Sequence, residues 1–218
     1  MHGQTWPSPA TAQASVLAND WLLFGTAGLA VAVIVWGLIL FSVFRWRRKG
    51  QTEGPLPPQF DTNNPLEIAW TAIPLLIVLA LFVYTYRAEA DVERLAPKPD
   101  VVVDVNAYQW NWTFAYLGGP TVQGSFAEPP QLVLPLGQTV RIVLTSSDVD
   151  HAFWVPDFLF KRDAIPGHPT SFDLNPSRLG TYLGRCAEFC GFDHALMDFS
   201  VRVVPSSDFN RWRSAHRT

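Results

Sequence analysis

Two thiols, one imidazole and one thioether lie within residues 186–197 of this sequence. Cys186 and Cys190 are its only cysteines, His194 follows them, and Met197 is the only methionine after Met1. Sulfur and imidazole ligands suit copper, zinc or an iron–sulfur cluster, whereas carboxylates and carbonyls suit magnesium or calcium. The thioether of Met197, as a further ligand, narrows the choice among these metals to copper.

Other uses of the two cysteines have to be weighed against copper. A structural disulfide is the usual role of paired cysteines outside the cytoplasm, but it would need neither His194 nor Met197. It would also not need His151, which opens the run 151–156. Zinc would bind two thiolates and two imidazoles in a closed tetrahedral site and leave the methionine unused. A mononuclear blue-copper site would leave one cysteine over.

Two copper ions bridged by both thiolates would use every soft ligand in this set. Each copper would then have one terminal imidazole, from His151 or His194. The remaining axial positions would go to Met197 on one copper and to a backbone carbonyl on the other. This arrangement leaves no soft side chain without a role.

Two long uncharged runs precede this site. Residues 21–44 would form a helix roughly 36 Å long, and residues 68–86 one of about 28 Å, near the lower limit for crossing a bilayer. A helix buried in a soluble core rarely stays uncharged on every side. We therefore predict transmembrane helices at residues 21–46 and 67–87. Pro74 removes a backbone hydrogen bond inside the second helix and predicts a kink.

Basic residues near the two spans predict their orientation. Residues 1–20 contain no lysine or arginine, and so lack the charged start of a secretory signal. Four basic residues follow the first span: Arg45, Arg47, Arg48 and Lys49. The positive-inside rule then places residues 47–66 in the cytoplasm and residues 1–20 on the extracytoplasmic side. The expected location is a bacterial plasma membrane, with both termini and everything after the second span outside.

Glu67 stands at the cytoplasmic start of the second span. An acid in the first turn of a helix complements the helix dipole. An acid at the membrane edge can also begin a proton path. The residues alone leave both interpretations open.

From residue 101 the sequence changes to short β-branched and aromatic runs separated by Gly and Pro turns, after a linker at residues 88–100. This pattern predicts an all-β sandwich or Greek-key barrel over residues 101–205. No alternation of strands and helices supports a thioredoxin-like or Rossmann domain. A polar tail, frayed or helical, is expected at residues 206–218. The eight predicted strands are residues 101–105, 109–116, 131–134, 139–145, 152–155, 171–174, 180–183 and 198–204.

The net charge is small, −3 from 16 basic and 19 acidic residues, so nothing indicates a nucleic-acid partner. The sequence also lacks the Cys-x-x-Cys-His motif that attaches a c-type haem.

Residues 186–197 resemble the binuclear CuA motif of cytochrome c oxidase subunit II, in the haem-copper oxidase family. The motif is Cys-x-Glu-x-Cys-Gly-x-x-His-x-x-Met, and every position is filled. That subunit has two membrane helices followed by a periplasmic cupredoxin domain, so the resemblance covers most of the chain. It implies a transmembrane hairpin followed by an all-β cupredoxin-like Greek-key domain.

The resemblance implies a role for each motif residue. Cys186 and Cys190 would bridge the two coppers, and His151 and His194 would be the terminal ligands. Met197 would be one axial ligand, and the backbone carbonyl of Glu188 would be the other. The Glu188 side chain would in addition bind magnesium or manganese at the interface with subunit I.

Three shorter segments carry the same resemblance. Residues 109–112 resemble the family's Gln-Trp-x-Trp segment, which implies that electrons from cytochrome c enter at Trp110, while Trp112 is expected in the core. The segment departs from the family at Tyr108 and Asn111. Residues 66–70 resemble the start of the family's second helix, where an acid at the position of Glu67 marks the entrance of a proton pathway.

The third segment, residues 161–167, resembles the family's Asp-Ala-x-Pro-Gly-Arg turn near subunit I, with His168 in place of the arginine. His168 is not expected to bind copper.

The resemblance implies an electron path from cytochrome c through Trp110 to the copper pair, and then through His194 to haem a of subunit I. Oxygen reduction to water and proton pumping would occur in subunit I, which would hold the haems and CuB. The expected partners are subunit I, further subunits such as subunit III, cytochrome c and membrane lipid.

Three related classes fit the residues less well. A quinol-oxidase subunit II would lack the copper ligands. A Sco-type copper chaperone has a thioredoxin fold and a single anchor. Nitrous-oxide reductase carries the same copper centre at the end of a large soluble chain.

Overall fold

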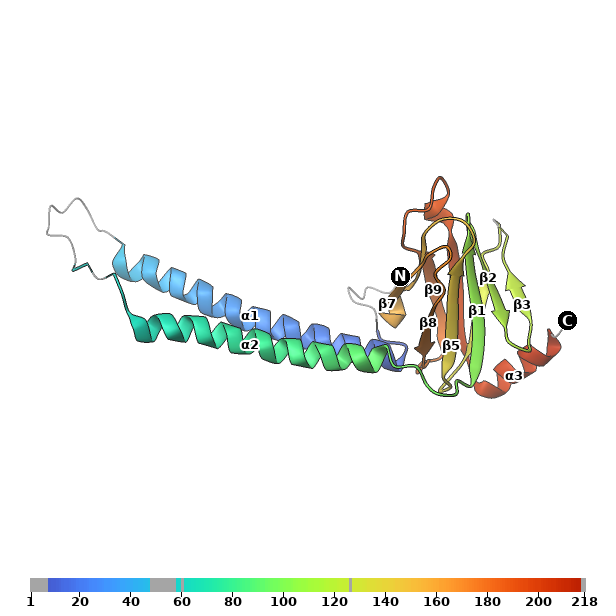
Figure 1. Cartoon of the computed structure of the whole chain (residues 1–218), viewed down its shortest axis with the longest axis horizontal. Coiled ribbons are helices and arrows are strands. Elements are labelled where there is room, and N and C mark those ends of the chain that lie inside the picture. Colours follow the sequence, from blue (N-terminus) through green and yellow to red (C-terminus); the bar gives the residue numbers. More distant parts are fainter. Residues whose placement is uncertain (1–7, 48–57, 60, 126, 217–218) are drawn as a thin grey trace. The chain divides into compact units, whose positions relative to one another are not determined.

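The structure is a computed structural model that describes residues 8–47, 58–59, 61–125 and 127–216 (Figure 1). Two compact units are present: a helical unit of residues 19–89, and a β unit made of the described residues before Asn19 and after Glu89. Arg48 and Lys49, on which part of the predicted orientation depends, lie outside the described residues.

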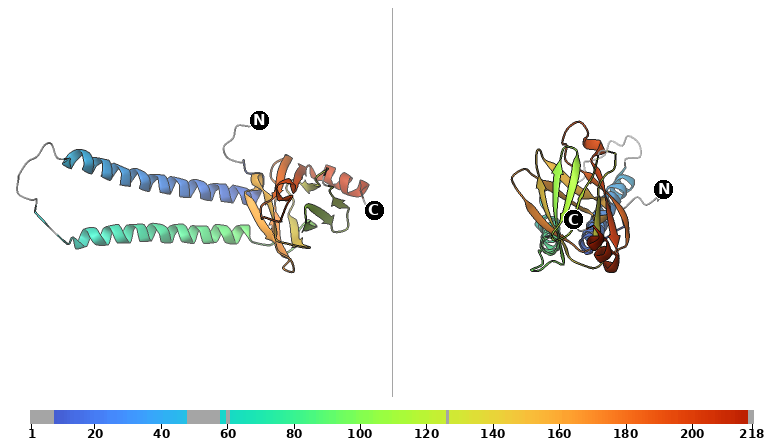
Figure 2. Two further views of the ribbon diagram at one scale, coloured as in Figure 1. Left: turned by 90° about the horizontal axis from the view of Figure 1, so that it is seen from above. Right: turned by 90° about the vertical axis from the view of Figure 1, so that its right-hand side faces the viewer.

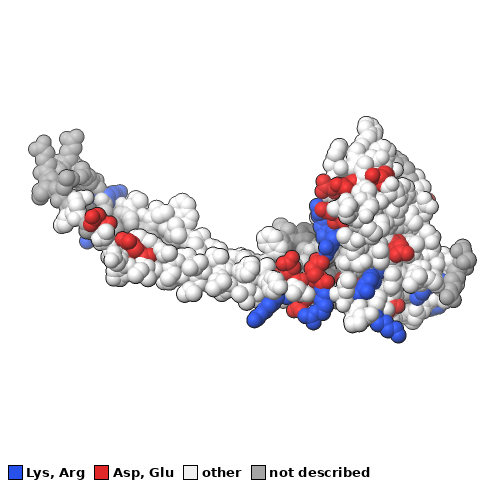
Figure 3. Space-filling view, in the orientation of Figure 1, with Lys and Arg blue, Asp and Glu red and all other residues white. Residues whose placement is uncertain are grey.

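The helical unit contains most of α1 (Ala12–Trp46) and of α2 (Asn64–Val92). Both helices are long and apolar enough to cross a membrane, and their apolar windows are not buried within the protein. Figure 3 shows almost no charged side chain along their middle. α1 begins before the first uncharged run, and α2 continues into residues 88–92 of the predicted linker. Pro74 lies inside α2.

The β unit is a sandwich of two five-stranded sheets that face each other (Figure 2). One sheet has the order β3-β2-β1-β5-β8 and the other β4-β10-β9-β6-β7. The β1–β5 and β4–β10 pairs are parallel, and the other pairs are antiparallel. The strands are β1 (Val101–Tyr108), β2 (Asn111–Tyr116), β3 (Thr121–Gln123), β4 (Gln131–Pro135), β5 (Val140–Ser146), β6 (His151–Val155), β7 (Phe160–Ala164), β8 (Thr170–Leu174), β9 (Gly180–Cys186) and β10 (Asp198–Val204).

Alternation along the strands creates the core. Inward positions of β1 and β2 are buried and alternate with more exposed ones, as the period of a strand requires. Fully burying one large apolar side chain stabilises a fold by about 1.5–3 kcal/mol. The aromatic centre of the core consists of Trp112, Phe114, Phe153, Phe172 and Phe199.

Two strands were not predicted, and both lie at a sheet edge. β3 has only three residues and pairs with β2 alone. β7 carries three charged residues between Phe160 and Ala164, and its two ends are the buried positions. Short or charged edge strands are common because they discourage pairing with other chains, and this also hides them from a search for apolar alternation.

Two predicted strand ends were wrong at places that matter for the site. The strand predicted from residue 109 begins at Asn111, because Gln109 and Trp110 form the turn between β1 and β2. β9 does not stop at Leu183 but continues to Cys186. Gly184 interrupts the β-forming pattern there, since the space of a side chain is filled by the ring of Phe199.

The residues after β10 form α3 (Ser206–Ala215), in agreement with the helical alternative for the tail. Phe209 is buried, and its ring lies 6.1 Å from that of Tyr116. Trp212 packs edge-on against Tyr116 at 5.0 Å. The helix is therefore anchored on the sandwich by aromatic contacts.

Two segments, one at the start of α1 and one after α2, are bound to the sandwich near β8 and near the residues after β6. Asp173 accepts hydrogen bonds from the backbone N–H of Ala96 at 2.6 Å and from the guanidinium of Arg141 at 2.8 and 2.9 Å. Residues 8–14, which we call the N-terminal strap, are held by backbone bonds from Ala10 to Asp157 and from Ala12 to Asn175. Both segments belong to the β unit.

Candidate metal centre

Neighbouring strands of one sheet bring the two halves of the candidate centre together. His151 is the first residue of β6 and Cys186 the last residue of β9, and Phe153 pairs with Cys186 between these strands. The β9–β10 loop, residues 187–197, carries the other candidate ligands. Its base is closed by the N–H of Cys186, which donates to the carbonyl of Met197 at 3.0 Å.

The two cysteines are free and buried, with their sulfurs 3.9 Å apart. A disulfide would need a separation of about 2 Å. The sulfurs and a ring nitrogen of His151 form a group of ligand atoms that all lie within 4.8 Å of one another. This group could therefore hold a metal ion, and the two sulfurs are too far apart for a disulfide.

Each sulfur has one imidazole beside it. His151 Nδ1 is 3.8 Å from Cys186 Sγ, and His194 Nδ1 is 3.5 Å from Cys190 Sγ. Each sulfur also has one weaker potential metal ligand beside it: the Glu188 carbonyl oxygen is 3.2 Å from Cys186 Sγ, and Met197 Sδ is 3.8 Å from Cys190 Sγ. All six predicted ligand positions thus lie together.

The two thiols differ in how readily they ionise. Burial raises the pKa of Cys186, but contacts with His151 and backbone groups outweigh it, so this pKa is lowered. Burial raises the pKa of Cys190, and the nearby charge of Cys186 raises it further. Without a cation, two thiolates this close repel each other. A soft cation that binds both would remove this repulsion, so the donor set fits copper.

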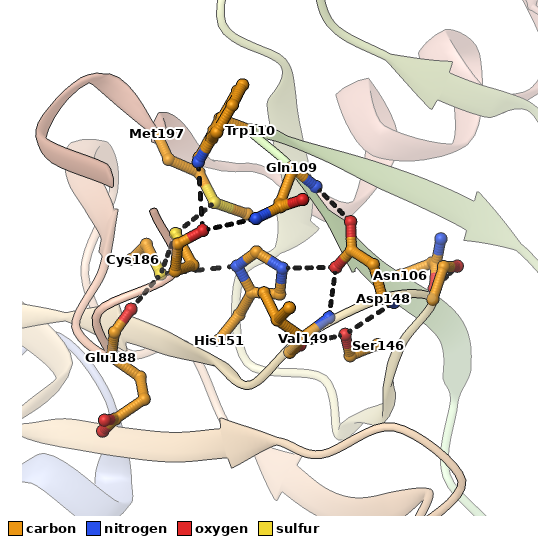
Figure 4. Close-up of polar contacts among 12 residues, drawn as sticks. Asn106, Gln109, Trp110, Ser146, Asp148, Val149, His151, Cys186, Glu188 and Met197 are labelled. Carbon is orange, nitrogen blue, oxygen red and sulfur yellow. Dashed lines mark hydrogen bonds and ion pairs between the residues drawn. The ribbon is translucent and has the colours of Figure 1, made fainter. Parts of the chain in front are cut away.

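Asp148 supports His151 from the side away from the sulfurs. Its Oδ1 lies 2.8 Å from His151 Nε2, and Figure 4 shows the imidazole between Cys186 and Asp148. Burial lowers the pKa of His151, yet the contacts with Cys186 and Asp148 outweigh this and raise it overall. Sequence reasoning missed Asp148. Its place three residues before a ligand histidine was the only signal.

The turn between β1 and β2 touches the other cysteine. Trp110 Nε1 donates to the carbonyl of Cys190 at 3.1 Å, and Gln109 Nε2 donates to the same oxygen at 2.7 Å. Trp110 is half-buried, whereas Trp112 is fully buried, as expected for a core residue. The Trp112 indole N–H donates to the carbonyl of Met197 at 3.4 Å.

Two further predicted site residues lie apart from the sulfurs. The Glu188 carboxylate points away from Cys186 in Figure 4, and its Oε2 is 3.7 Å from Lys161 Nζ. Glu67 belongs to the helical unit, and its Oε1 accepts the backbone N–H of Asn63 at 3.0 Å at the start of α2. This contact is that of a helix-capping acid.

The β9–β10 loop carries three exposed apolar side chains. Phe189, Phe192 and Leu196 are exposed by 77%, 94% and 59%. Exposed apolar side chains gathered on one loop are typical of a surface that a partner covers.

Two family models match separate parts of the chain. "Cytochrome C oxidase subunit II, transmembrane domain" matches residues 2–88, and "Cytochrome C oxidase subunit II, periplasmic domain" matches residues 125–204.

Relatives match over nearly the whole chain. It is 40% identical to the probable cytochrome c oxidase subunit 2 of Streptomyces coelicolor, with 91% of this chain and 74% of that protein covered. It is 34% identical to cytochrome c oxidase subunit 2 of Mycobacterium tuberculosis, with 96% and 74% covered. Among solved structures, it resembles the periplasmic domain of subunit II of cytochrome oxidase of Bradyrhizobium japonicum, at 31% identity and a TM-score of 0.51, covering 56% of this chain and 96% of that one. The two apolar helices, the cupredoxin-like sandwich and these matches show that the chain belongs to the cytochrome c oxidase subunit II family.

Proposed function

We propose that this chain is the electron-accepting subunit of a proton-pumping cytochrome c oxidase. It would take electrons from cytochrome c at a binuclear copper centre (CuA) and pass them to haem a in subunit I, where oxygen is reduced to water. Family membership makes the chain a membrane subunit of a multi-subunit oxidase and implies that it binds copper. The observation that carries the proposal is the pair of free sulfurs at 3.9 Å, each with its own imidazole and a weaker donor.

The proposed ligands follow from these contacts. Cys186, Cys190, His151 and His194 would hold the copper ions through their sulfur and imidazole atoms. Met197 and the backbone carbonyl of Glu188 would complete the ligand set. When bound, the copper pair supplies one-electron chemistry, with the charge shared over both metals through the thiolates. The sandwich contributes rigidity, because His151 and Cys186 lie on paired strands and cannot move apart easily.

Trp110 is the proposed point where electrons enter. It is half-buried, so part of the indole faces solvent, while its N–H bonds to the carbonyl of Cys190. The ring therefore joins the protein surface to a ligand residue through one hydrogen bond. His194 is the proposed exit toward haem a, and it too is only half-buried.

The Glu188 carboxylate is the proposed ligand that this chain offers to magnesium or manganese at the subunit I interface. A carboxylate oxygen is a ligand that these hard cations prefer. In this chain it lies near Lys161, so the cation would have to displace that ion pair. The remaining ligands would come from the partner.

The proposed location is a bacterial plasma membrane, with the β unit on the extracytoplasmic side. Arg45 and Arg47, at and just after the C-terminal end of α1, support a cytoplasmic connection between the helices. The exposed apolar side chains of the β9–β10 loop support a partner surface beside the centre, and cytochrome c and subunit I are the proposed partners.

Electron paramagnetic resonance of the full-length chain, purified in detergent and loaded with copper, tests the proposal. We expect two coppers per chain and the hyperfine pattern of one unpaired electron shared by two copper nuclei. Cys190→Ser should abolish this pattern. His168→Ala is the matched control, because His168 is exposed and outside the ligand set, and it should leave the pattern unchanged. Hyperfine structure from a single copper would contradict the proposal.

A further inference from the structure

Asp148 is not a ligand, yet its two carboxylate oxygens contact both sides of the candidate centre. Oδ1 lies 2.8 Å from His151 Nε2, and Oδ2 accepts the backbone N–H of Gln109 at 2.6 Å. We propose that Asp148 is a positioning residue that orients the ligand His151 and at the same time holds the Gln109–Trp110 turn against Cys190. The inference rests on the proposed function, since it assigns a role toward the same copper centre.

The carboxylate is itself held in place. The N–H of Val149 donates to Oδ1 at 2.7 Å, in addition to the contacts with His151 and Gln109. Ser146, at the end of β5, donates its hydroxyl to the carbonyl of Val149 at 2.5 Å and accepts the N–H of Asp148 at 3.4 Å. These local bonds fix the turn between β5 and β6, so the side chain of Asp148 has little freedom to turn away.

The contact with Asp148 determines which nitrogen of His151 can bind a metal. A carboxylate accepts hydrogen bonds, so its contact with Nε2 favours the tautomer that carries the proton there and leaves Nδ1, which faces Cys186, able to bind a metal. His151 is fully buried, which means that bulk water cannot take over this role. A carboxylate behind a ligand histidine fixes the tautomer and the ring plane and makes the imidazole a stronger ligand.

The second oxygen of Asp148 acts on the tryptophan turn. Gln109 is bound by its backbone to Asp148 and by its side-chain amide to the carbonyl of Cys190. Trp110 donates to that same carbonyl. Gly191 allows this close approach, because a Cβ there would lie 3.2 Å from Gln109 Nε2 and 3.3 Å from the Trp110 ring. The carboxylate of Asp148 thus connects the proposed ligand His151 with Trp110, the proposed point where electrons enter.

Two substitutions and one control separate this role from a general charge effect. Asp148→Ala removes the contacts with His151, Val149 and Gln109 together. Asp148→Asn keeps the shape but replaces one carboxylate oxygen by an NH₂ group, so either the contact with Gln109 or the contacts with His151 and Val149 are lost. Asp150→Asn is the matched control, since Asp150 is an exposed acid two positions away and the substitution makes the same change in charge.

The full-length chain in detergent is titrated with copper against a competing chelator, and its electron paramagnetic resonance spectrum and reduction potential are recorded. We expect copper binding about 10–100-fold weaker for Asp148→Ala, as for other carboxylates behind a ligand histidine. Asp148→Asn should show a smaller loss, together with altered copper hyperfine splitting and a shifted potential. Asp150→Asn should match the unmodified chain. Slower oxidation of reduced cytochrome c by the assembled oxidase is expected for both Asp148 variants.

The inference is overturned if Asp148→Asn keeps the affinity, spectrum and potential of the unmodified chain, or if Asp150→Asn changes them equally. Should Asp148→Ala fail to fold, Asp148→Asn decides alone. Failure of the proposed function has a different signature, because the unmodified chain itself would then lack the spectrum of a copper pair.

Discussion

At the scale of single residues, the candidate centre depends on short contacts made by few side chains. The carbonyl of Cys190 accepts from both Gln109 and Trp110, and the imidazole of His151 is held between Cys186 and Asp148. Truncation of one such group takes a hydrogen bond away from a buried partner, at a cost of about 1–3 kcal/mol where that partner is left with none. Small substitutions here should therefore change either copper binding or electron transfer more than the fold.

Trp110→Phe tests the proposed point of electron entrance. Phenylalanine keeps an aromatic ring but lacks the N–H that bonds to Cys190, so electron transfer from reduced cytochrome c should slow while the copper spectrum stays unchanged. Stopped-flow oxidation of cytochrome c by the assembled oxidase measures this. Trp212→Phe is the matched control, because Trp212 is also a partly buried tryptophan packed on the core. Equal rates in both variants would remove Trp110 from the electron path.

At the scale of elements, Tyr116 connects β2 with β4 and α3. Its hydroxyl donates to the carbonyl of Val133 at 2.9 Å and accepts the N–H of Val133 at 2.7 Å, while its ring lies against Phe209 and Trp212. Burial raises the pKa of Tyr116 well above the ordinary value of 10.0, and this outweighs the opposite effect of the Val133 contact. The folded state therefore favours the neutral phenol.

A dependence of stability on pH follows from this shift. The folded state retains the Tyr116 proton at pH values where the unfolded chain releases it, so the contribution is fully present below about pH 10 and falls as pH rises further. Tyr116→Phe should lack this part of the alkaline loss and should be less stable near neutral pH by about 1–3 kcal/mol, because the Val133 groups lose their partner. Urea unfolding between pH 8 and 11, followed by β-sheet circular dichroism, measures both effects. An identical pH dependence in the variant would contradict the assignment.

The helices, strands and site residues differ in how well the sequence predicts them. The candidate ligand side chains could be chosen from residue types and spacing, whereas the carbonyl of Glu188 came only from the family resemblance. The strands that contribute most of the core show the expected apolar alternation. β3 and β7 were not predicted, because edge strands need not show an apolar pattern. The end of β9 at Cys186 was not predicted, because glycine is unfavourable in a strand pattern. Gly184 is needed there to leave room for the ring of Phe199. Asp148 was not predicted because its role depends on the tertiary contact with Gln109 in the turn between β1 and β2, which is distant in sequence.

At the scale of the whole molecule, Glu67 is the candidate residue that the structure leaves with two interpretations. Its contact with Asn63 is a helix cap, whereas the family resemblance implies a proton-path entrance. Asn63 also caps the helix through its own side chain, which accepts the N–H of Leu66 at 3.3 Å. The acid and the asparagine can therefore be changed separately.

Glu67→Gln in the assembled oxidase is expected to slow turnover, because an amide cannot take up and release a proton as a carboxylate does. Asn63→Ala weakens the cap by about 0.5–2 kcal/mol but keeps the carboxylate, and it should leave turnover unchanged. Oxygen consumption across a range of pH measures both. Normal turnover of Glu67→Gln at every pH would contradict the proton-path role and leave helix capping as the only role of Glu67.

The N-terminal strap has a consequence for the order of assembly. Gln13 bonds to Asn175 across 162 positions of sequence, and Ala10 bonds to Asp157 and Ser177. Contacts of such separation form slowly, because the intervening chain must first be brought together. During synthesis the strap is made before its partners at residues 157–177, so it can bind only after the two membrane helices and these residues exist. The residues that open α1 therefore complete the β unit at the end of folding, and protection of the Ala10 and Ala12 amides from hydrogen exchange would mark the finished protein.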